Sequence, residues 1–343
     1  MKSRTPAALA LIATLVALVI AGCGGGSSDS ADGDGGANDN AETQLSLVAY
    51  AVPKVGFDKV IPAFQATPEG RGVGFSQSYG ASGDQSRKVE SGLRTDVVNF
   101  SVEPDVTRLV EAGLVDEDWN SNEHRGIPFG SVVSIVVRRG NPLGIRGWDD
   151  LLRDGVEVVT PNPFSSGSAK WNLLAPYADK SDGGRNVQAG LDYLQQLIGD
   201  HVRVQPRSGR EATETFLQGT GDVLLSYENE AYFMEEQGEE VEHINPDVTF
   251  KIENPVAAVN RSEHPRETQA FVDYLYTPEA QRLWAEAGFR PVDTTVAGEF
   301  ADKFPDPRKL WTIADLGGWG PVNDELFDEE NGSVARIYDE ATS

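Results

Sequence analysis

The feature that most constrains this chain is a turn rich in serine and proline at residues 160–172 (TPNPFSSGSAKWN). The valines of residues 156–159 predict a strand before the turn, and the two prolines end that strand. Trp171, Leu174 and Ala175 then recur at helical spacing. The first N–H groups of a helix lack partners within the helix, and the helix dipole makes that end positive. The segment therefore predicts either an ordinary serine cap or a helix N-terminus that holds a small anion.

Two further junctions in the chain have the same character. Residues 79–84 (YGASGD) and residues 207–211 (RSGRE) are each rich in small residues and precede a predicted helix. In open α/β sheets, ligands bind beyond the carboxyl ends of the strands, where such junctions meet. Three helix N-termini directed at one point would hold an anion without using a charged side chain.

From residue 45 onward, short β-type runs alternate with amphipathic segments, and this pattern predicts an α/β fold. The predicted strands are residues 45–50, 73–79, 96–100, 131–138, 156–159, 222–226 and 256–260. The predicted helices are residues 57–65, 85–92, 104–112, 169–177, 186–198, 211–217, 265–276 and 278–287. About 300 residues remain after the N-terminal segment, which exceeds a typical single domain and predicts two lobes.

The N-terminus reads as a targeting segment rather than as part of the fold. Lys2 and Arg4 precede an apolar run that ends in IAGC, which resembles a bacterial lipobox. This resemblance implies a signal peptide at residues 1–22, cleavage before Cys23 and lipidation of the Cys23 thiol. A transmembrane helix is the alternative, but the run is shorter than the roughly 20 residues that a span requires. A flexible linker is predicted at residues 23–44.

The charge and the cysteine count exclude several classes of function. Aspartate and glutamate number 54 against 29 lysines and arginines, which gives a formal net charge of −25. Nucleic acid is not expected as a partner, because contact with its phosphates needs a basic face. Cys23 is the only cysteine, so the mature domain has no disulfide and no thiol chemistry. The four histidines lack the spacing of metal ligands, and neither a metal nor a cofactor is predicted.

An enzyme and an adhesive surface protein are the two rival classes. The chain has no nucleophile elbow, P-loop or dinucleotide fingerprint, and Ser166 and Lys170 are too far apart for an S-x-x-K motif. Residues 227–230 (YENE) are interpreted as a helix start with acidic first-turn residues, rather than as catalytic carboxylates. The six tryptophans could form an adhesive patch, but most are expected to pack in the core.

Six segments together resemble the solute-binding protein of the bacterial sulfate/thiosulfate ABC importer, and in particular its actinobacterial members. The segments are YGASGDQ, GIPFGSVVSIVVRRGNP, TPNPFSSGSAKWNLLAPYA, GDVLLSYENEA, FRPVD and LWTIADLGGWG. They occur in family order, and the resemblance spans residues 45–338. It implies a two-lobed type II periplasmic-binding-protein fold. Lobe one would comprise residues 45–129 and 256–343, lobe two residues 130–255, and the two hinge crossovers would lie near 127–132 and 252–256.

The same resemblance implies a sulfate site in the cleft, made of uncharged hydrogen-bond donors. Ser166 would donate its hydroxyl, and the other positions would donate backbone N–H groups. The implied amide donors are Ala51, Ser82, Gly167, Ser168 and either Gly209 or Arg210. Tyr227 stands where other members have a tryptophan whose indole N–H reaches the anion. The implied protein is a monomer, lipid-anchored on the outer face of the cytoplasmic membrane, whose partners are the permease and ATPase subunits of the importer.

A site of this kind suits sulfate, because sulfate is a dianion without a proton at neutral pH. Hydrogen phosphate carries a proton that needs an acceptor, and leaving such a group buried without a partner costs about 1–3 kcal/mol. Asp84 and Glu211 lie close to two of the junctions, and a carboxylate that reached the ligand would favour phosphate. We expect both to stabilise first helical turns instead. Thiosulfate, molybdate, tungstate and phosphate remain as competing ligands.

Overall fold

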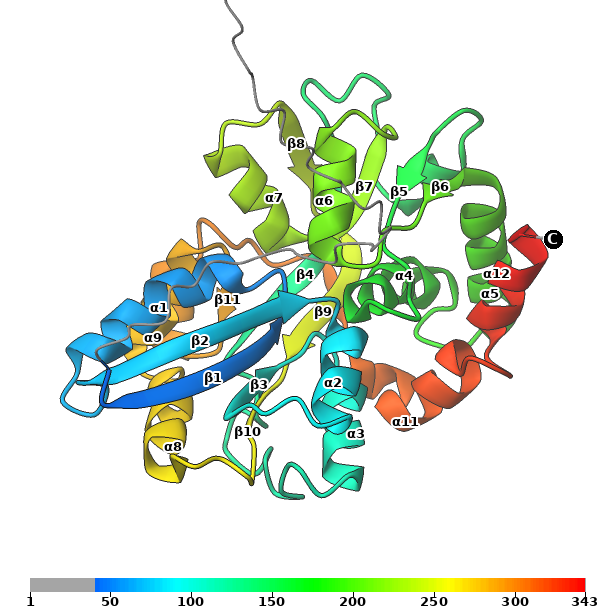
Figure 1. Cartoon of the computed structure of the whole chain (residues 1–343). Coiled ribbons are helices and arrows are strands. Elements are labelled where there is room, and N and C mark those ends of the chain that lie inside the picture. Colours follow the sequence, from blue (N-terminus) through cyan, green and yellow to red (C-terminus); the bar gives the residue numbers. More distant parts are fainter. Residues whose placement is uncertain (1–40, 343) are drawn as a thin grey trace, which may run out of the picture. The chain divides into compact units, whose positions relative to one another are not determined.

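The computed structural model describes residues 41–342. The predicted signal peptide, Cys23 and most of the predicted linker lie outside these residues. Within residues 41–342, none of the helices is both long and apolar enough to span a bilayer. This part of the chain forms two β-sheets with helices packed around them (Figure 1).

The smaller sheet is four-stranded, in the order β10-β3-β1-β2. Its strands are β1 (Thr43–Tyr50), β2 (Val73–Gly80), β3 (Val97–Asn99) and β10 (Val256–Ala258). β1 is parallel to both β2 and β3, with Tyr50 opposite Gly80, whereas β10 is antiparallel to β3. The carboxyl ends of three parallel strands therefore meet at one edge of this sheet.

An aromatic core joins the smaller sheet to its helices. These helices are α1 (Lys54–Ala66), α2 (Ser82–Glu90), α3 (Glu103–Glu111), α8 (Pro265–Tyr274) and α9 (Pro278–Glu286). Phe57 of α1 meets Trp284 of α9 edge-on, with 5.1 Å between the ring centroids. Phe64, two helical turns further along α1, meets Phe271 of α8 at 5.2 Å. Such edge-to-face aromatic contacts fix how these helices pack on one another.

The larger sheet follows the order β12-β9-β4-β7-β5-β6, with β8 and β11 also paired to β4. Its strands are β4 (Phe129–Arg138), β5 (Val158–Val159), β6 (Val202–Val204), β7 (Val223–Tyr227), β8 (Val241–Ile244), β9 (Val248–Asn254), β11 (Arg290–Pro291) and β12 (Lys309–Trp311). β5 is parallel to β6 and to β7, so the carboxyl ends of these three strands also share an edge. Figure 1 shows β4 and β9 in the middle of the molecule, between β1 and β7.

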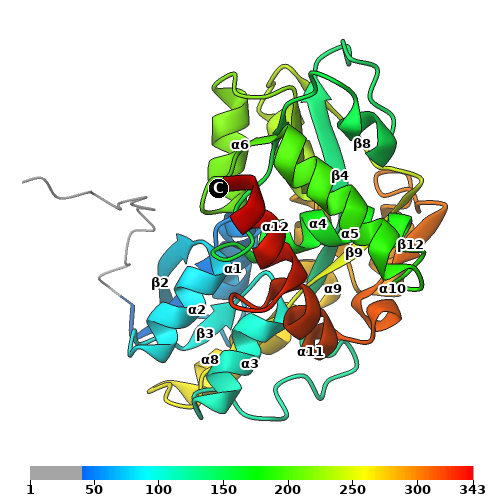
Figure 2. The same ribbon diagram turned by 90° about the vertical axis from the view of Figure 1, so that its right-hand side faces the viewer.

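Three helices follow the parallel strands of the larger sheet and begin at its carboxyl edge: α4 (Gly167–Lys180) after β5, α6 (Gly209–Leu217) after β6 and α7 (Glu228–Glu236) after β7. η1 (Trp148–Leu152) precedes β5, and α5 (Val187–Gln196) and η2 (Leu197–His201) connect α4 to β6. The C-terminal part adds α10 (Thr294–Glu299), η3 (Ile313–Leu316), α11 (Trp319–Val322), η4 (Asn323–Phe327) and α12 (Ser333–Thr342). α12 packs against α5, as Figure 2 shows.

The predicted α/β class is confirmed, and each predicted strand and helix has a counterpart whose ends move by a few residues. Prolines open α3, α8 and α9, where their missing N–H has no cost. The elements that were not predicted include β6, β8, β9, β12 and α12. β6 and β12 are only three residues long, which is too short for a periodic pattern to stand out.

Candidate functional site

The N-terminus of α4 is the first component of the candidate site. Ser166 occupies the N-cap position and is 2% exposed, yet its side chain accepts no hydrogen bond from the helix. Within the described chain, nothing bonds to the Ser166 hydroxyl, and no group accepts from the amides of Gly167 and Ser168. The ordinary serine cap is therefore not formed, and this helix N-terminus keeps several unused donors.

The smaller sheet brings a second helix N-terminus to the site. Ser82 begins α2 just after β2, and its hydroxyl donates to Asp105 Oδ2 at 2.5 Å. The same hydroxyl accepts from the N–H of Ser101 at 2.9 Å. The Ser82 amide has no acceptor among the described residues, and Ala51 lies directly beyond the end of β1. Ala51 and Ser82 thus lie at the carboxyl edge of the smaller sheet.

The larger sheet adds the N-terminus of α6. Here the N-cap is an ordinary one, because the Ser208 hydroxyl accepts from the N–H of Glu211 at 3.2 Å. A methyl group added at Gly209 would lie 3.0 Å from Ser168 Oγ and 3.2 Å from Val52 Cγ2. The start of α6 is therefore in contact with the starts of α4 and α1. The amide of Gly209, like those of Gly167 and Ser168, has no acceptor among the described residues.

The side chain of Arg210 is engaged away from these amides. Its Nη2 donates to Glu230 Oε1 at 2.9 Å, and its guanidinium stacks on the ring of Phe233 at 4.2 Å from the centroid. Thr213 also donates to Glu230, which is fully buried. Burial raises the pKa of the Glu230 carboxyl, and Arg210 and Thr213 oppose that shift. The positive charge of Arg210 is thus paired with Glu230.

Tyr227 is the last residue of β7 and is 1% exposed. Its hydroxyl oxygen lies 2.7 Å from Ser101 Oγ, and either group can be the donor. Burial raises the pKa of the Tyr227 hydroxyl well above its usual value, although hydrogen bonds to Ser101, Ser168 and Asn254 oppose this. The phenol is therefore uncharged near neutral pH and keeps its proton as a hydrogen-bond donor.

Ser101 was not predicted from the sequence, yet it joins the two sheets at this site. It follows β3, and its carbonyl oxygen accepts from Trp171 Nε1 at 2.8 Å and from Asn254 Nδ2 at 3.1 Å. A methyl group at Gly167 would lie 2.8 Å from the Ser101 Cβ, so α4 approaches Ser101 closely. A sequence signal existed, because Ser101 directly follows a predicted strand parallel to the one before Ala51.

The nearby carboxylates bind basic side chains or the groups of a neighbouring turn rather than the unused donors. Asp84 lies 2.6 Å from both Arg87 and Arg207, and Glu211 accepts from the N–H of Arg207 at 3.1 Å. The YENE segment does begin a helix, α7, as predicted. Its first-turn glutamates, Glu228 and Glu230, are both buried. Glu228 is fully buried and binds Arg290 at 2.7 Å, because a carboxylate in the interior needs a cationic partner.

A cavity of 40 Å³ adjoins Ser166 and Gly167 and is also lined by three basic side chains. Each of these side chains has a polar partner: Arg87 binds Asp84, Arg108 binds Asp105, and Lys170 donates to Asn323 Oδ1 at 2.9 Å. Burial lowers the pKa of the Lys170 ammonium. Arg87 and Arg108 are thus paired with carboxylates, whereas Lys170 bonds to an uncharged amide. The carboxylates of Asp105 and Glu329 also line this cavity and act on the Lys170 ammonium.

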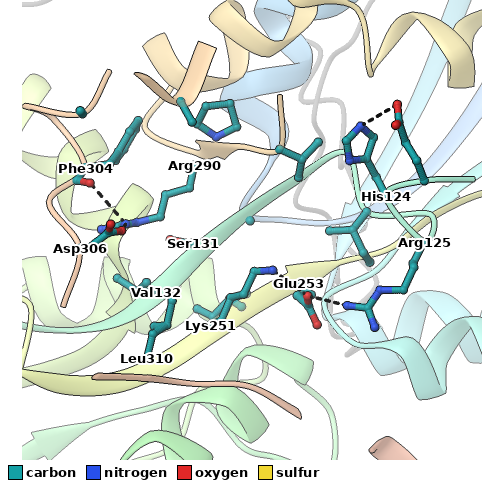
Figure 3. Close-up of a pocket in the computed structure, with 18 residues that line it drawn as sticks. His124, Arg125, Ser131, Val132, Lys251, Glu253, Arg290, Phe304, Asp306 and Leu310 are labelled. Carbon is teal, nitrogen blue, oxygen red and sulfur yellow. Dashed lines mark hydrogen bonds and ion pairs between the residues drawn. The ribbon is translucent and has the colours of Figure 1, made fainter. Parts of the chain in front are cut away.

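A wider cavity of 510 Å³ lies between β4, β9 and the C-terminal part of the chain (Figure 3). None of the predicted site residues lines it. Figure 3 shows its charged side chains already in pairs, with Glu253 bound to Arg125 and Arg290 beside Asp306. Lys251 also binds Glu253, at 2.9 Å. This cavity offers no uncompensated charge and no cluster of free amides. In the described chain, no group of His, Cys, Asp and Glu is placed to hold a metal ion.

Comparisons with known proteins agree with the geometry. The sequence model of the bacterial extracellular solute-binding protein family matches residues 45–290. The chain is 37% identical to a sulfate-binding protein of Synechococcus elongatus, over 93% of this chain and 92% of that protein. It is 32% identical to a thiosulfate-binding protein of Pseudomonas aeruginosa, over 89% and 94%. Among solved structures, the sulfate-binding protein SubI from Mycobacterium tuberculosis is 63% identical, with a TM-score of 0.82, and covers 83% of this chain and all of that chain.

Two sheets that present their carboxyl edges to one cluster of donors define a two-lobed binding protein with the type II fold. The periplasmic binding protein AfuA from Actinobacillus pleuropneumoniae shares this fold at 18% identity, with a TM-score of 0.62. The chain belongs to the family of bacterial extracellular solute-binding proteins. It is a binding protein of a transport system rather than an enzyme, and it acts outside the cytoplasm.

Proposed function

We propose that this protein captures sulfate, with thiosulfate as a second ligand, and delivers it to an ABC import permease. The observation that carries this proposal is the cluster of unused, uncharged donors at the starts of α2, α4 and α6. Relatives named as sulfate-binding and thiosulfate-binding proteins, which match nearly the whole chain, support it. The proposed donors are the Ser166 and Tyr227 hydroxyls and the amides of Ala51, Ser82, Gly167, Ser168 and either Gly209 or Arg210.

The chemistry of this cluster favours an anion that brings no proton. The free groups donate hydrogen bonds, and the adjacent carboxylates of Asp84, Glu211 and Glu230 are held by arginines or by backbone N–H groups. Hydrogen phosphate would need an acceptor for its proton and would bury that proton without one, at a cost of about 1–3 kcal/mol. A fully deprotonated dianion incurs no such penalty. Selectivity for sulfate then follows because no free carboxylate is available as an acceptor, and the hydroxyls of Ser166 and Tyr227 serve as donors.

The proposed donors come from both sheets, and this suggests how binding is coupled to transport. In our proposal, lobe one contains residues 45–129 and 256–343, and lobe two contains residues 130–255. β11 and β12 of the C-terminal part reach across this division to pair with β4 and β9. The hinge crossovers lie near residues 127–132 and 252–256. An anion bonded from both sides stabilises the closed form over an open one, so closure signals that the protein is loaded. The permease and ATPase subunits of the importer would recognise that closed form.

Attachment to the membrane is a separate part of the proposal and rests on the N-terminal sequence. Cleavage before Cys23 and lipidation of its thiol would tether the protein to the outer face of the cytoplasmic membrane through the linker of residues 23–44. Intact mass measurement of the protein purified from bacterial membranes tests this. A diacylglyceryl-sized increase on a chain that begins at Cys23 is expected. An unmodified N-terminus, or a Cys23→Ser variant that stays with the membrane, would refute the anchor.

Calorimetric titration of the purified protein tests the ligand. Sulfate and thiosulfate are expected to bind tightly, and phosphate and molybdate weakly. Ser166→Ala should weaken sulfate binding roughly 10- to 150-fold, since a hydrogen bond to a charged group contributes about 1.5–3 kcal/mol. Ser181→Ala is a matched control, because Ser181 is a buried serine at the opposite end of α4. Preference for phosphate or molybdate, or equal losses in the two variants, would refute the proposal.

A further inference from the structure

Two consecutive residues at the start of α2 contact the loops of the larger sheet. The N–H of Gly83 donates to the carbonyl oxygen of Ser165 at 3.1 Å. Asp84 Oδ2 lies 2.6 Å from Arg207 Nη2. α2 follows a strand of the smaller sheet, whereas Ser165 and Arg207 follow β5 and β6 of the larger sheet. We refer to these four residues as the cleft rim, because they join the loops of the two sheets directly.

The two loops of the larger sheet are also fastened to each other. Ser165 Oγ donates to the carbonyl oxygen of Arg207 at 2.8 Å. The N–H of Asn162 donates to the carbonyl oxygen of Pro206 at 2.8 Å. The N–H of Arg207 in turn donates to Glu211 Oε2 in the first turn of α6. The contact of Arg207 with Asp84 therefore restrains both loops together.

Each rim contact lies beside a proposed anion donor. Gly83 directly follows Ser82, and Ser165 directly precedes Ser166. Arg207 lies two residues before the first amide of α6. Docking of the rim therefore sets the starts of α2, α4 and α6 relative to one another, although no rim side chain needs to touch the anion.

The rim differs from the donor cluster in its charge and its exposure. The side chain of Asp84 is 20% exposed and that of Arg207 is 62% exposed. Burial raises the pKa of the Asp84 carboxyl, but hydrogen bonds from Arg207 and Arg87 outweigh this and hold it below its usual value. Asp84 is therefore charged near neutral pH and faces two cations, Arg87 on its own helix and Arg207 across the cleft.

We infer that the Asp84–Arg207 pair is a latch that positions the three helix N-termini and slows the release of the bound anion. The inference rests on the proposed sulfate binding and adds two positioning residues to it. Because the pair joins the two sets of loops, its contribution exists only in the closed form. Its loss raises the rate of anion dissociation and leaves the rate of association nearly unchanged.

Rapid-mixing measurements of sulfate association and dissociation test the latch in four proteins: wild type, Asp84→Asn, Arg207→Gln and the double variant. Each single variant is expected to dissociate roughly two- to fivefold faster, the size typical of a partly exposed ion pair. The double variant should dissociate no faster than the single variants, because both changes remove the same interaction. The double variant is needed to isolate the Asp84–Arg207 interaction, because Arg207 has contacts besides Asp84. High salt should accelerate release from the wild type alone.

A steering role for Arg207 predicts the opposite pattern and would overturn the latch. In that case Arg207→Gln slows association, Asp84→Asn speeds it, and the dissociation rates do not change. Additive effects on dissociation would also overturn it. Asp182→Asn is the control, because it removes an exposed pair with Arg185 of the same 2.6 Å length and should change neither rate. If the wild type binds no sulfate, the proposed function fails. If the wild type binds sulfate and the Asp84 and Arg207 variants release it at the wild-type rate, the latch alone fails.

Discussion

The two parts of the cleft hold the sheets together by different physical means. We call Ser82, Ser101, Ser166, Gly167 and Tyr227 the cleft floor; they are buried and uncharged. The floor joins the two sheets through the hydrogen bond between Ser101 and Tyr227 and the close packing of Gly167 on Ser101. The cleft rim is partly exposed and includes an ion pair. Hydrogen bonds in a buried site are insensitive to salt and cannot be replaced by water. An exposed ion pair is weakened by salt and contributes about 1 kcal/mol or less.

Because of this difference, the affinity for the anion and its dissociation rate can be controlled by different parts of one cleft. The floor holds the groups that would touch the anion, so changes there should alter affinity and selectivity by large factors. The rim holds the groups that would keep the cleft closed, so changes there should act mainly on the dissociation rate. Substitutions in the floor and in the rim test this division.

Gly167→Ala should have the largest effect. The added methyl group would lie 2.8 Å from Ser101 Cβ and 3.1 Å from Val102 Cγ2, so α4 must move away from the smaller sheet. Overpacking of this kind costs about 1–3 kcal/mol, and sulfate affinity should fall roughly 5- to 150-fold. Calorimetry measures the loss. Gly199→Ala is the control, because no atom lies within 4 Å of its added methyl group. Unchanged affinity in Gly167→Ala would contradict the close approach of the two sheets at the floor.

Tyr227→Phe should have an intermediate effect. It removes the hydroxyl that lies 2.7 Å from Ser101 Oγ and leaves that buried serine without one partner. A buried hydrogen bond contributes about 1 kcal/mol, so sulfate affinity should fall roughly fivefold. Calorimetry of Tyr227→Phe, Ser101→Ala and the double variant checks this. The two losses should not add, because they share one interaction. Fully additive losses would mean that the two hydroxyls act independently.

Gly83→Ala should change stability and affinity in opposite directions. Alanine stabilises a helix by roughly 0.5–1 kcal/mol relative to glycine. The new methyl group would, however, lie 3.1 Å from the carbonyl oxygen of Ser165 and disturb the rim. Thermal unfolding without sulfate should therefore occur at a slightly higher temperature, while sulfate dissociates a few times faster. Gly298→Ala, in α10, should show only the gain in stability, because open space surrounds its methyl position. Slower dissociation in Gly83→Ala would contradict the assigned rim contact.

The smallest effect should be the pH dependence of the rim. The pKa of Asp84 is lowered in the folded protein from its ordinary value of 3.8. A lowered carboxyl pKa means that the ion pair contributes fully above the ordinary value and is lost as the pH falls through the lowered one. The dissociation rate should therefore be constant from pH 8 to about pH 5 and rise below about pH 4. Asp84→Asn should remove that rise. A rise already near pH 6 would point to a different titrating group.

The sequence predicted the alternation of elements and the three helix starts, because local patterns encode both. The SSGS turn shows small residues, a strand before it and helical spacing after it. The residues predicted on three separate turns do meet, since β1 and β2 in one sheet and β5, β6 and β7 in the other are parallel and end at shared edges. The close approach of Gly209 to Ser168 and Val52 shows that the starts of α6, α4 and α1 lie together.

What the sequence could not provide are contacts between residues far apart in the chain. Ser101 lies in an unremarkable SVEPD segment, and its role appears only when Tyr227 and Trp171 are brought to it. The pairing of Asp84 with Arg207 has the same origin. The acidity of YENE indicates a helix start, which α7 confirms, but not that Glu228 is buried; its partner Arg290 comes from the C-terminal part of the chain. Such pairings depend on tertiary structure and leave no periodic signal.

The ratio of sulfate affinity to phosphate affinity tests the central claim most directly. If the floor offers the anion only uncharged donors, calorimetry of the wild-type protein at pH 7 should show sulfate bound at least about tenfold more tightly than phosphate. This is the smallest preference expected when a proton is buried without an acceptor, at roughly 1–3 kcal/mol. Equal affinities, or a preference for phosphate, would mean that an acceptor enters the site and would contradict the account.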